Sequence, residues 1–271
     1  METEEITLAG KHGDLVTRVV RNPGATHLVV IAHGYGEHGG RYDHVARHLA
    51  GHRATVVIPD HHGHGRSAGE RVLATDFDDF VADLHTVLTW AKESFPGLPA
   101  VLVGHSMGGL IAARYAQVHG AGLAGLALSG PIVGGNPAFQ ALADMDPMPE
   151  VPIDPAQLSR DRAVGEAYAA DPLVWHGPFK ATTLKALIAC VERLAAGPAL
   201  GDLPLLWLHG GDDAIVPLEI NRSAVYALRG PDFEEHVYAG AAHEIFNETN
   251  KDEVLGDLSG FIRRVTTAGR N

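Results

Sequence analysis

The sequence has little of what would direct a chain out of the cell or into a membrane. It holds a single cysteine, Cys190, so no disulfide can form within the chain. Its longest purely aliphatic runs, such as residues 28–32, are far shorter than a membrane-spanning helix. The first ten residues, METEEITLAG, are acidic and lack the apolar stretch of a signal peptide. We therefore expect a cytoplasmic location, with peripheral contact to membranes as a second expectation.

Basic residues are also scarce. The 271 residues include 21 Lys and Arg against 33 Asp and Glu, which leaves a formal net charge of −12. An acidic surface argues against nucleic acid as a partner, and it offers no basic patch to an anionic membrane. With 45% hydrophobic residues, the chain is long enough for one large domain, or for one domain that carries an insertion.

Apolar runs alternate with segments of helical periodicity over most of the chain. A hairpin is expected from residues 5–9 and 15–21, and buried strands are expected at residues 28–32, 55–58, 101–103, 123–129, 204–209 and 235–238. Helices are expected at residues 42–50, 76–95, from residue 109 onward, 219–228 and 254–265. This alternation predicts an α/β protein with a mostly parallel central sheet and helices on both of its faces.

The pattern breaks after Pro131. Residues 134–155 contain seven residues that are proline or belong to a glycine pair, and helical pieces are expected around residues 155–169 and 182–196. Ligands of open α/β sheets bind at the carboxyl edge of the strands. A helical stretch inserted after a central strand therefore predicts a cap over that edge. We expect a core formed by residues 1–131 and 201–271, and a helical cap formed by residues 132–200.

Residues 100–115, AVLVGHSMGGLIAARY, predict a short buried strand, a sharp turn and a helix. The turn fits the pattern G-x-S-x-G, which places Ser106 at the apex of a nucleophile elbow. Glycine is needed on both sides of the serine because the backbones approach closely there. The helix N-terminus behind Ser106 also presents free N–H groups and a positive dipole to a developing oxyanion. Ser106 is therefore the candidate nucleophile.

A serine hydroxyl needs a general base and an orienting carboxylate before it can attack a carbonyl. His243 follows the final expected strand and precedes the last helix, which makes it the candidate base among 17 histidines. Asp212 and Asp213 both follow the preceding strand, and the end of that strand does not choose between them. The order serine, acid, histidine is the order found on the α/β-hydrolase sheet.

Backbone donors for an oxyanion are expected from two loops. One is the N–H of Met107, just after the serine, and the other is the N–H of Tyr35 in the glycine-rich loop 33–40. The turn is expected to direct His105 away from the serine. Three histidines lie among residues 61–64, but they alternate with glycine and share no fixed face, so we expect a structural loop and no metal or organic cofactor.

Several motifs resemble those of the monoacylglycerol lipases of the α/β-hydrolase superfamily. They are HGYGEHGGRY (residues 33–42), DHHGHGRSAGER (60–71), GHSMGG (104–109), DPL (171–173) and GAAHE (240–244). The resemblance extends from about residue 28 to residue 243, although residues 134–165 match poorly. It implies an α/β-hydrolase fold with an inserted helical cap.

The resemblance also implies roles for individual residues. The acid is Asp213, which stands at the aspartate of the family pattern HG-x-x-D, and Tyr35 and Met107 are the oxyanion donors. Glu37, Arg41 and Tyr168 align with the polar residues that surround the glycerol end of the family's pocket. For Glu37 and Arg41, an internal salt bridge that shapes the loop is an alternative of equal weight.

Residues and resemblance together predict a carboxylic-ester hydrolase that cleaves monoacylglycerol, or a similar acyl ester, through an acyl-enzyme. Apolar residues of the cap are expected either to touch a lipid surface transiently or to pack into the pocket; they are Ile132, Val133, Phe139, Leu142 and Met145. Two alternatives stay open. One is a general carboxylesterase or lysophospholipase of the same fold, and the other is a non-catalytic protein that binds acyl ligands.

Overall fold

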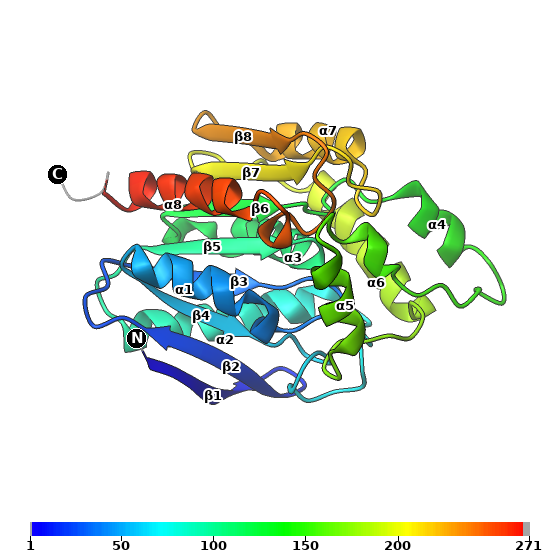
Figure 1. Ribbon diagram of the computed structural model, residues 1–271, viewed down its shortest axis with the longest axis horizontal. Helices are drawn as coiled ribbons and strands as arrows, with labels where there is room; N and C mark the ends of the chain where they lie inside the picture. The colour runs from blue at the N-terminus through cyan, green and yellow to red at the C-terminus, as the bar shows by residue number, and fades with distance from the viewer. Residues whose placement is uncertain (1, 268–271) are drawn as a thin grey trace.

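The computed structural model describes residues 2–267 and is built on one eight-stranded sheet (Figure 1). The strands are β1 (Glu2–Gly10), β2 (Gly13–Arg21), β3 (His27–Ala32), β4 (Ala54–Pro59), β5 (Ala100–His105), β6 (Gly125–Ser129), β7 (Leu205–Gly210) and β8 (Phe233–Tyr238). Their order in the sheet is β1-β2-β4-β3-β5-β6-β7-β8. Strand β2 is antiparallel to both of its neighbours, and every pair from β4 to β8 is parallel. The mostly parallel sheet expected from the sequence is confirmed.

Helices cover both faces of this sheet. On one face lie α1 (Asp43–Gly51), which follows the short 3-10 helix η1 (Gly39–Tyr42), and α8 (Lys251–Thr267). On the other face lie α2 (Phe77–Ser94), α3 (Met107–His119) and α7 (Leu218–Leu228). Strands β3 to β7 are buried at every position between these layers. This explains why their sequences are continuous apolar runs rather than alternating patterns.

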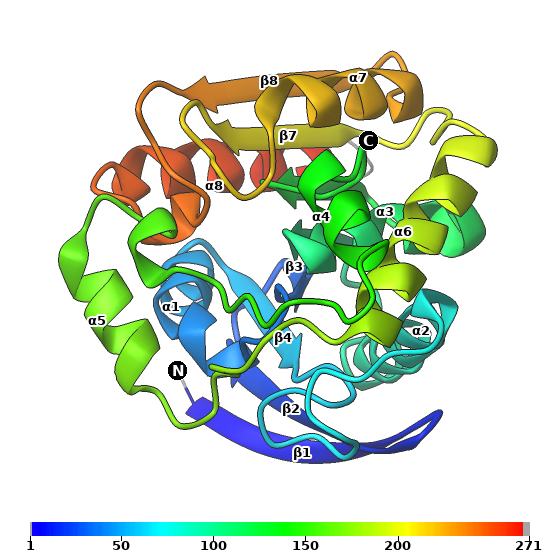
Figure 2. The ribbon, with the colours of Figure 1, turned by 90° about the vertical axis from the view of Figure 1, so that its right-hand side faces the viewer.

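A helical insertion, residues 132–200, separates β6 from β7. It contains α4 (Pro137–Ala143), the 3-10 helix η3 (Pro155–Gln157), α5 (Arg162–Ala170) and α6 (Ala181–Ala196). Figures 1 and 2 show these elements at the edge of the sheet where the parallel strands end. The insertion thus lies over the edge at which the loops carrying the candidate residues converge.

The insertion differs from the expected pattern in two places. Helix α4 was not expected, although Asn136 caps it by accepting the Ala138 amide and Pro137 stands in its first turn, both of which are start signals. The helical piece expected over residues 155–169 is interrupted between η3 and α5. There Arg160 leaves the helical path and binds the Glu248 carboxylate in the core at 2.9 Å.

The apolar residues of the insertion mostly face inward. Ile132, Val133 and Leu142 are buried, and Phe139 is partly buried against the core. Ile132 and Phe139 line the cavity described below, as the alternative of packing into a pocket expects, and contact of these residues with a lipid surface stays a prediction. Met145 alone of the five is exposed, with 52% of its surface accessible. Between residues 2 and 267, none of the helices has both the length and the apolar character needed to cross a membrane.

The close contact between the start of α3 and the end of β3 leads to a prediction about stability. A Cβ atom on Gly108 would lie 2.1 Å from the carbonyl oxygen of Ala32 and 2.4 Å from that of His33. Backbone atoms cannot swing aside, so Gly108→Ala should lower the free energy of unfolding by about 2–3 kcal/mol. Urea denaturation followed by circular dichroism measures this change.

Gly256 in α8 provides the matched control, because a Cβ there would meet nothing within 4 Å. Gly256→Ala should leave the free energy of unfolding unchanged or raise it by up to about 1 kcal/mol, since alanine favours the helix. Equal destabilisation by the two substitutions would contradict the close approach at Gly108.

Candidate active site

The turn between β5 and α3 holds Ser106 in a strained backbone conformation. Its φ angle is 54° and its ψ angle is −117°, a region that residues with a Cβ rarely adopt. A Cβ on Gly104 would lie 2.4 Å from the carbonyl oxygen of Gly108, so the flanking glycines are required by the tightness of the turn. The strain presents the serine side chain to the loops beyond the ends of the strands.

His243 lies within hydrogen-bond distance of both partners expected for it. Its Nε2 is 2.9 Å from Ser106 Oγ, and its Nδ1 is 2.7 Å from Asp213 Oδ2. The other oxygen of Asp213 accepts the amides of Ile215 and Val216 at 2.9 and 2.8 Å, which fixes the carboxylate. Asp212 is exposed and points to neither group. The structure therefore brings Ser106, His243 and Asp213 together and leaves Asp212 outside.

Burial and neighbouring charges determine the protonation states of His243 and Asp213. Burial disfavours the charged form of His243, but the adjacent Asp213 carboxylate outweighs it and holds the pKa of the imidazole above 6.5. Burial alone would raise the pKa of Asp213, but His243 and the backbone amides lower it below its ordinary value. Asp213 is thus ionised near neutral pH, and Nδ1 of His243 carries the proton that it donates to Asp213. This leaves Nε2 as the acceptor for the serine hydroxyl.

The two residues expected to supply oxyanion donors lie at the same cavity as Ser106. Tyr35 and Met107 both line its cavity, and neither amide donates a hydrogen bond to another group within residues 2–267. Gly34 is close enough that a Cβ on it would lie 3.3 Å from Ser106 Cβ. The amide of Gly34 is in turn held by Glu37 Oε1 at 2.6 Å.

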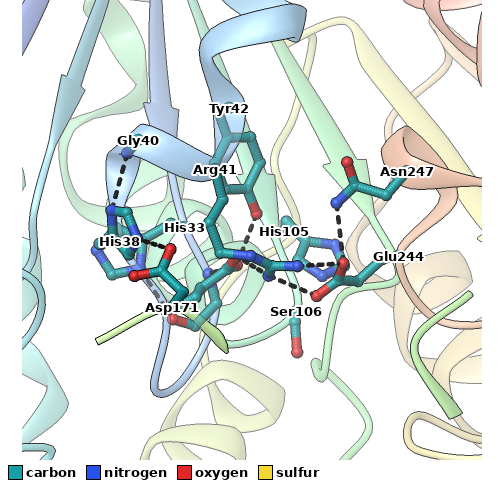
Figure 3. A network of polar contacts seen from close by, with 12 residues as sticks. His33, His38, Gly40, Arg41, Tyr42, His105, Ser106, Asp171, Glu244 and Asn247 are labelled. Carbon is teal, nitrogen blue, oxygen red and sulfur yellow. Dashed lines mark hydrogen bonds and ion pairs between the residues drawn. The ribbon is translucent and has the colours of Figure 1, made fainter. Parts of the chain in front are cut away.

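A buried ion network ties this loop to the loop that carries His243 (Figure 3). Arg41 donates to Glu37 at 2.6 Å and to both oxygens of Glu244 at 2.6 and 2.7 Å. Tyr42 also donates its hydroxyl to Glu37, at 2.7 Å. Burial opposes the charged form of Glu37, yet Arg41 and these donors lower the pKa of its carboxyl. The carboxylate of Glu37 is therefore already occupied by groups of the chain.

Glu244 was quoted in the motif GAAHE but was given no role from the sequence. It lies next to His243, lines the cavity and makes the paired contact with Arg41. Its position directly after His243 was the one sequence signal for a role at the site. The contact with Arg41 could not be read from the sequence, because the two residues lie 203 positions apart.

Comparison with known proteins assigns this site to a family. The family described as "Serine aminopeptidase, S33" matches residues 23–250. The chain is 38% identical over 244 residues to the monoacylglycerol lipase of Mycolicibacterium smegmatis, and the match covers 87% of each chain. The chain belongs to the monoacylglycerol lipase family. Human monoglyceride lipase is 32% identical to it, over 89% of this chain and 84% of the human one.

Solved structures agree with this assignment. The monoacylglycerol lipase of Paleococcus ferrophilus superposes with a TM-score of 0.75 at 26% identity, covering 98% of this chain and 99% of that one. A soluble variant of the monoglyceride lipase of Saccharomyces cerevisiae, in complex with a substrate analog, gives a TM-score of 0.81 at 22% identity, with 97% and 95% covered. The predicted α/β-hydrolase fold is confirmed, and as a member of this family the chain is a serine hydrolase.

The cavity of this monoacylglycerol lipase family member is lined by both polar and apolar side chains. Its polar lining residues include Glu37, Arg41, Glu244 and Tyr168, and its apolar lining residues come from the insertion and the core: Ile132, Ile153, Leu158, Phe139, Phe179, Leu187, Ile215 and Val216. The guanidinium of Arg41 lies 4.9 Å from the ring centre of Tyr168. The hydroxyl of Tyr168 is buried and has no hydrogen-bond partner within the described chain.

His105 was expected to face away from Ser106; it nevertheless lies beside His243. Its ring lies 4.8 Å from the ring of His243 and lines the cavity, while its Nδ1 hydrogen-bonds to the Ser129 carbonyl at 3.0 Å. The turn does separate it from the serine hydroxyl, but the loop of His243 folds back over it. Burial, and to a smaller extent the neighbouring His243, lower the pKa of His105 to about 4, so the ring is neutral.

The histidine-rich loop is part of the interior. His33 donates from Nδ1 to the Gly34 carbonyl at 2.8 Å and accepts the His61 amide at Nε2 at 3.0 Å, which joins the two glycine-rich loops. The ring of His64 packs at 6.2 Å from that of Phe80. Over the part of the chain that the structure describes, no three His, Cys, Asp or Glu side chains group in a way that could hold a metal ion.

The contacts of His243 lead to a prediction about the pKa of its imidazole. The pKa of its imidazole should lie above its ordinary value, and Asp213→Asn should lower it, because burial is then opposed only by the carboxylates of Glu244 and Glu37. Proton NMR of the ring resonances against pH measures this, with His243→Gln to assign the signal. Asp212→Asn is the control and should leave the pKa unchanged. The same shift in both aspartate variants would argue against the assignment of Asp213.

Proposed function

We propose that this chain hydrolyses monoacylglycerols to fatty acid and glycerol, with Ser106 as nucleophile, His243 as general base and Asp213 as the orienting carboxylate. The observation that carries the proposal is the continuous hydrogen-bonded series from Asp213 through His243 to Ser106, at 2.7 and 2.9 Å. A serine hydroxyl becomes a useful nucleophile at neutral pH only when such a base stands beside it.

The steps follow from the geometry. Ser106 Oγ attacks the ester carbonyl while His243 Nε2 takes its proton, and Asp213 stabilises the imidazolium that forms. The N–H groups of Tyr35 and Met107 receive the oxyanion, and the loss of one such donor costs roughly 10²–10³ in rate. Glycerol leaves with the proton of His243, and water activated by the same imidazole then releases the fatty acid from Ser106. Activity should fall as the pH drops through the pKa of His243, because only the neutral ring can accept the proton.

The mixed lining of the cavity supports an amphiphilic ester as substrate. Its apolar side chains suit an acyl chain, and its polar side chains suit the hydroxyls of glycerol. Glu37 and Arg41 already bind each other and the chain, so we propose that they shape the loop rather than bind substrate directly. The free hydroxyl of Tyr168 is then the group that we assign to a glycerol hydroxyl. The names of the family relatives agree with this substrate class.

We also propose that residues 132–200 act as a cap on a core of residues 1–131 and 201–271. Support comes from the cavity, whose lining includes Phe139 of α4 and Leu187 of α6. Contact with a lipid surface would involve the large apolar residues of this segment that are exposed, Met145 and Val151, at 52% and 44%. Asp144, Asp146 and Glu150 lie among them in the sequence, so an uncharged surface would be favoured over an anionic one.

Ser106→Ala tests the nucleophile. The variant should lose hydrolysis of a monoacylglycerol series and covalent labelling by a fluorophosphonate probe, whereas Ser223→Ala should keep both. Ser223 is a suitable control because its hydroxyl bonds only within α7, to the Glu219 carbonyl. Labelling or turnover that survives Ser106→Ala would refute the assignment. Faster turnover of triacylglycerols or lysophospholipids than of monoacylglycerols would refute the substrate.

Tyr168→Phe tests the glycerol side of the cavity. Removing one hydrogen bond should lower kcat/KM for a monoacylglycerol by about 2- to 12-fold, the range expected for a neutral hydrogen bond. The ethyl ester of the same fatty acid has no glycerol hydroxyls, so its kcat/KM should not change. Equal losses on both esters would mean that Tyr168 supports the cavity and does not bind glycerol.

A further inference from the structure

The space around Ser106 is smaller than the substrate. The cavity measures about 40 Å³. One water needs roughly 10–15 Å³ by the same kind of measure, so the cavity has room for about three or four waters. A glycerol headgroup with an acyl chain is much larger than that. The acyl chain must therefore extend into space that the closed cavity does not include.

An apolar groove lies directly behind one wall of the cavity. It measures about 270 Å³ and runs along α4, α6 and the start of α7, where Ile188, Val191 and Ile220 line it. Phe139 and Leu187 line both the groove and the Ser106 cavity. These two side chains thus form the wall between the two spaces.

A second hollow next to the cavity is unsuited to an acyl chain. It measures about 240 Å³ and shares Arg41 with the cavity, but it is lined by charged side chains that include Arg18, Asp43, Asp60 and Arg66. Methylene groups placed there would gain little and would strip water from the charges. Of these two neighbouring spaces, the groove is the one whose lining matches an acyl chain.

Phe139 is the movable half of the wall. It stands on α4, a helix of seven residues, and it is only partly buried, with its ring 5.2 Å from that of Phe179. Leu187 is buried to 5% exposure within the 16 residues of α6. Figure 2 shows α4 beside α6 in front of the strand ends. Displacing Phe139 therefore disturbs fewer contacts than displacing Leu187.

We propose that Phe139 sets the acyl-chain preference by closing the passage from the Ser106 cavity to the groove between α4 and α6. Short acyl chains end on the Ser106 side of its ring and need little of the space beyond it, whereas long chains reach the groove only by displacing the ring. This inference rests on the proposed ester hydrolysis. It adds to that function a residue that determines specificity and a binding site for the far end of the chain.

The test compares kcat/KM for butyryl, octanoyl and palmitoyl monoacylglycerols. Phe139→Ala should raise the ratio of palmitoyl to butyryl turnover by about tenfold or more, since the passage is then open. Val174→Ala is the control for loss of packing within the insertion. Val174 is buried in a cluster that does not include Phe139 and lines neither space, so its variant should leave the ratio unchanged.

A second substitution tests the groove without touching the wall. Val191 lines the groove but not the cavity, so Val191→Trp should fill the far site. It should lower palmitoyl turnover about tenfold, leave butyryl turnover unchanged, and cancel the gain of Phe139→Ala in the double variant. This single variant decides the proposal even if Phe139→Ala does not fold.

The outcomes separate the two proposals. An unchanged chain-length profile in Val191→Trp, or the same shift in Val174→Ala as in Phe139→Ala, would overturn the role of Phe139 and the groove. Absence of turnover for every ester in the unaltered protein would instead overturn the proposed hydrolysis, on which this inference rests.

Discussion

The site depends on the close contact between the turn at Ser106 and the strands beside it. Gly104 and Gly108 leave no room for a side chain, and Gly108 lies against the backbone at the end of β3. This contact forces the positive φ of Ser106 and places Met107 at the first turn of α3. The proposed nucleophile and one proposed oxyanion donor therefore occupy positions that packing imposes, not positions that their own side chains select.

The second requirement is that buried charges be paired across distant loops. Arg41 joins Glu37 near the oxyanion loop to Glu244 beside His243, and Asp213 is held by His243 and two amides. An unpaired charge in such a place would be costly, so each pair favours one arrangement of the loops. The same arrangement leaves Tyr168 with an unused hydroxyl at the cavity.

Much of the fold could be predicted because the strands are covered on both faces and so appear as continuous apolar runs. Helix α4 was missed since its few residues give too short a periodic signal, despite its cap at Asn136. The inward packing of Ile132, Val133 and Leu142 was left open, because apolar residues in a cap suit a pocket and a lipid surface equally well. The proximity of His105 to His243 was not expected, because the loop of His243 is remote in sequence.

The sequence by itself determined the order of the candidate catalytic residues along the chain. A strained serine in a glycine-flanked turn comes first, then an acid and then a histidine, each after a strand. These are local properties, set by backbone sterics and by where each strand ends. The end of the strand left Asp212 and Asp213 open, and the resemblance to a family pointed to Asp213. Only the tertiary structure decided that Glu244 closes the network of Arg41 and that Phe139 stands between a cavity and a groove. Those outcomes depend on the mutual burial of segments far apart in the chain, and no local pattern records how such segments pack.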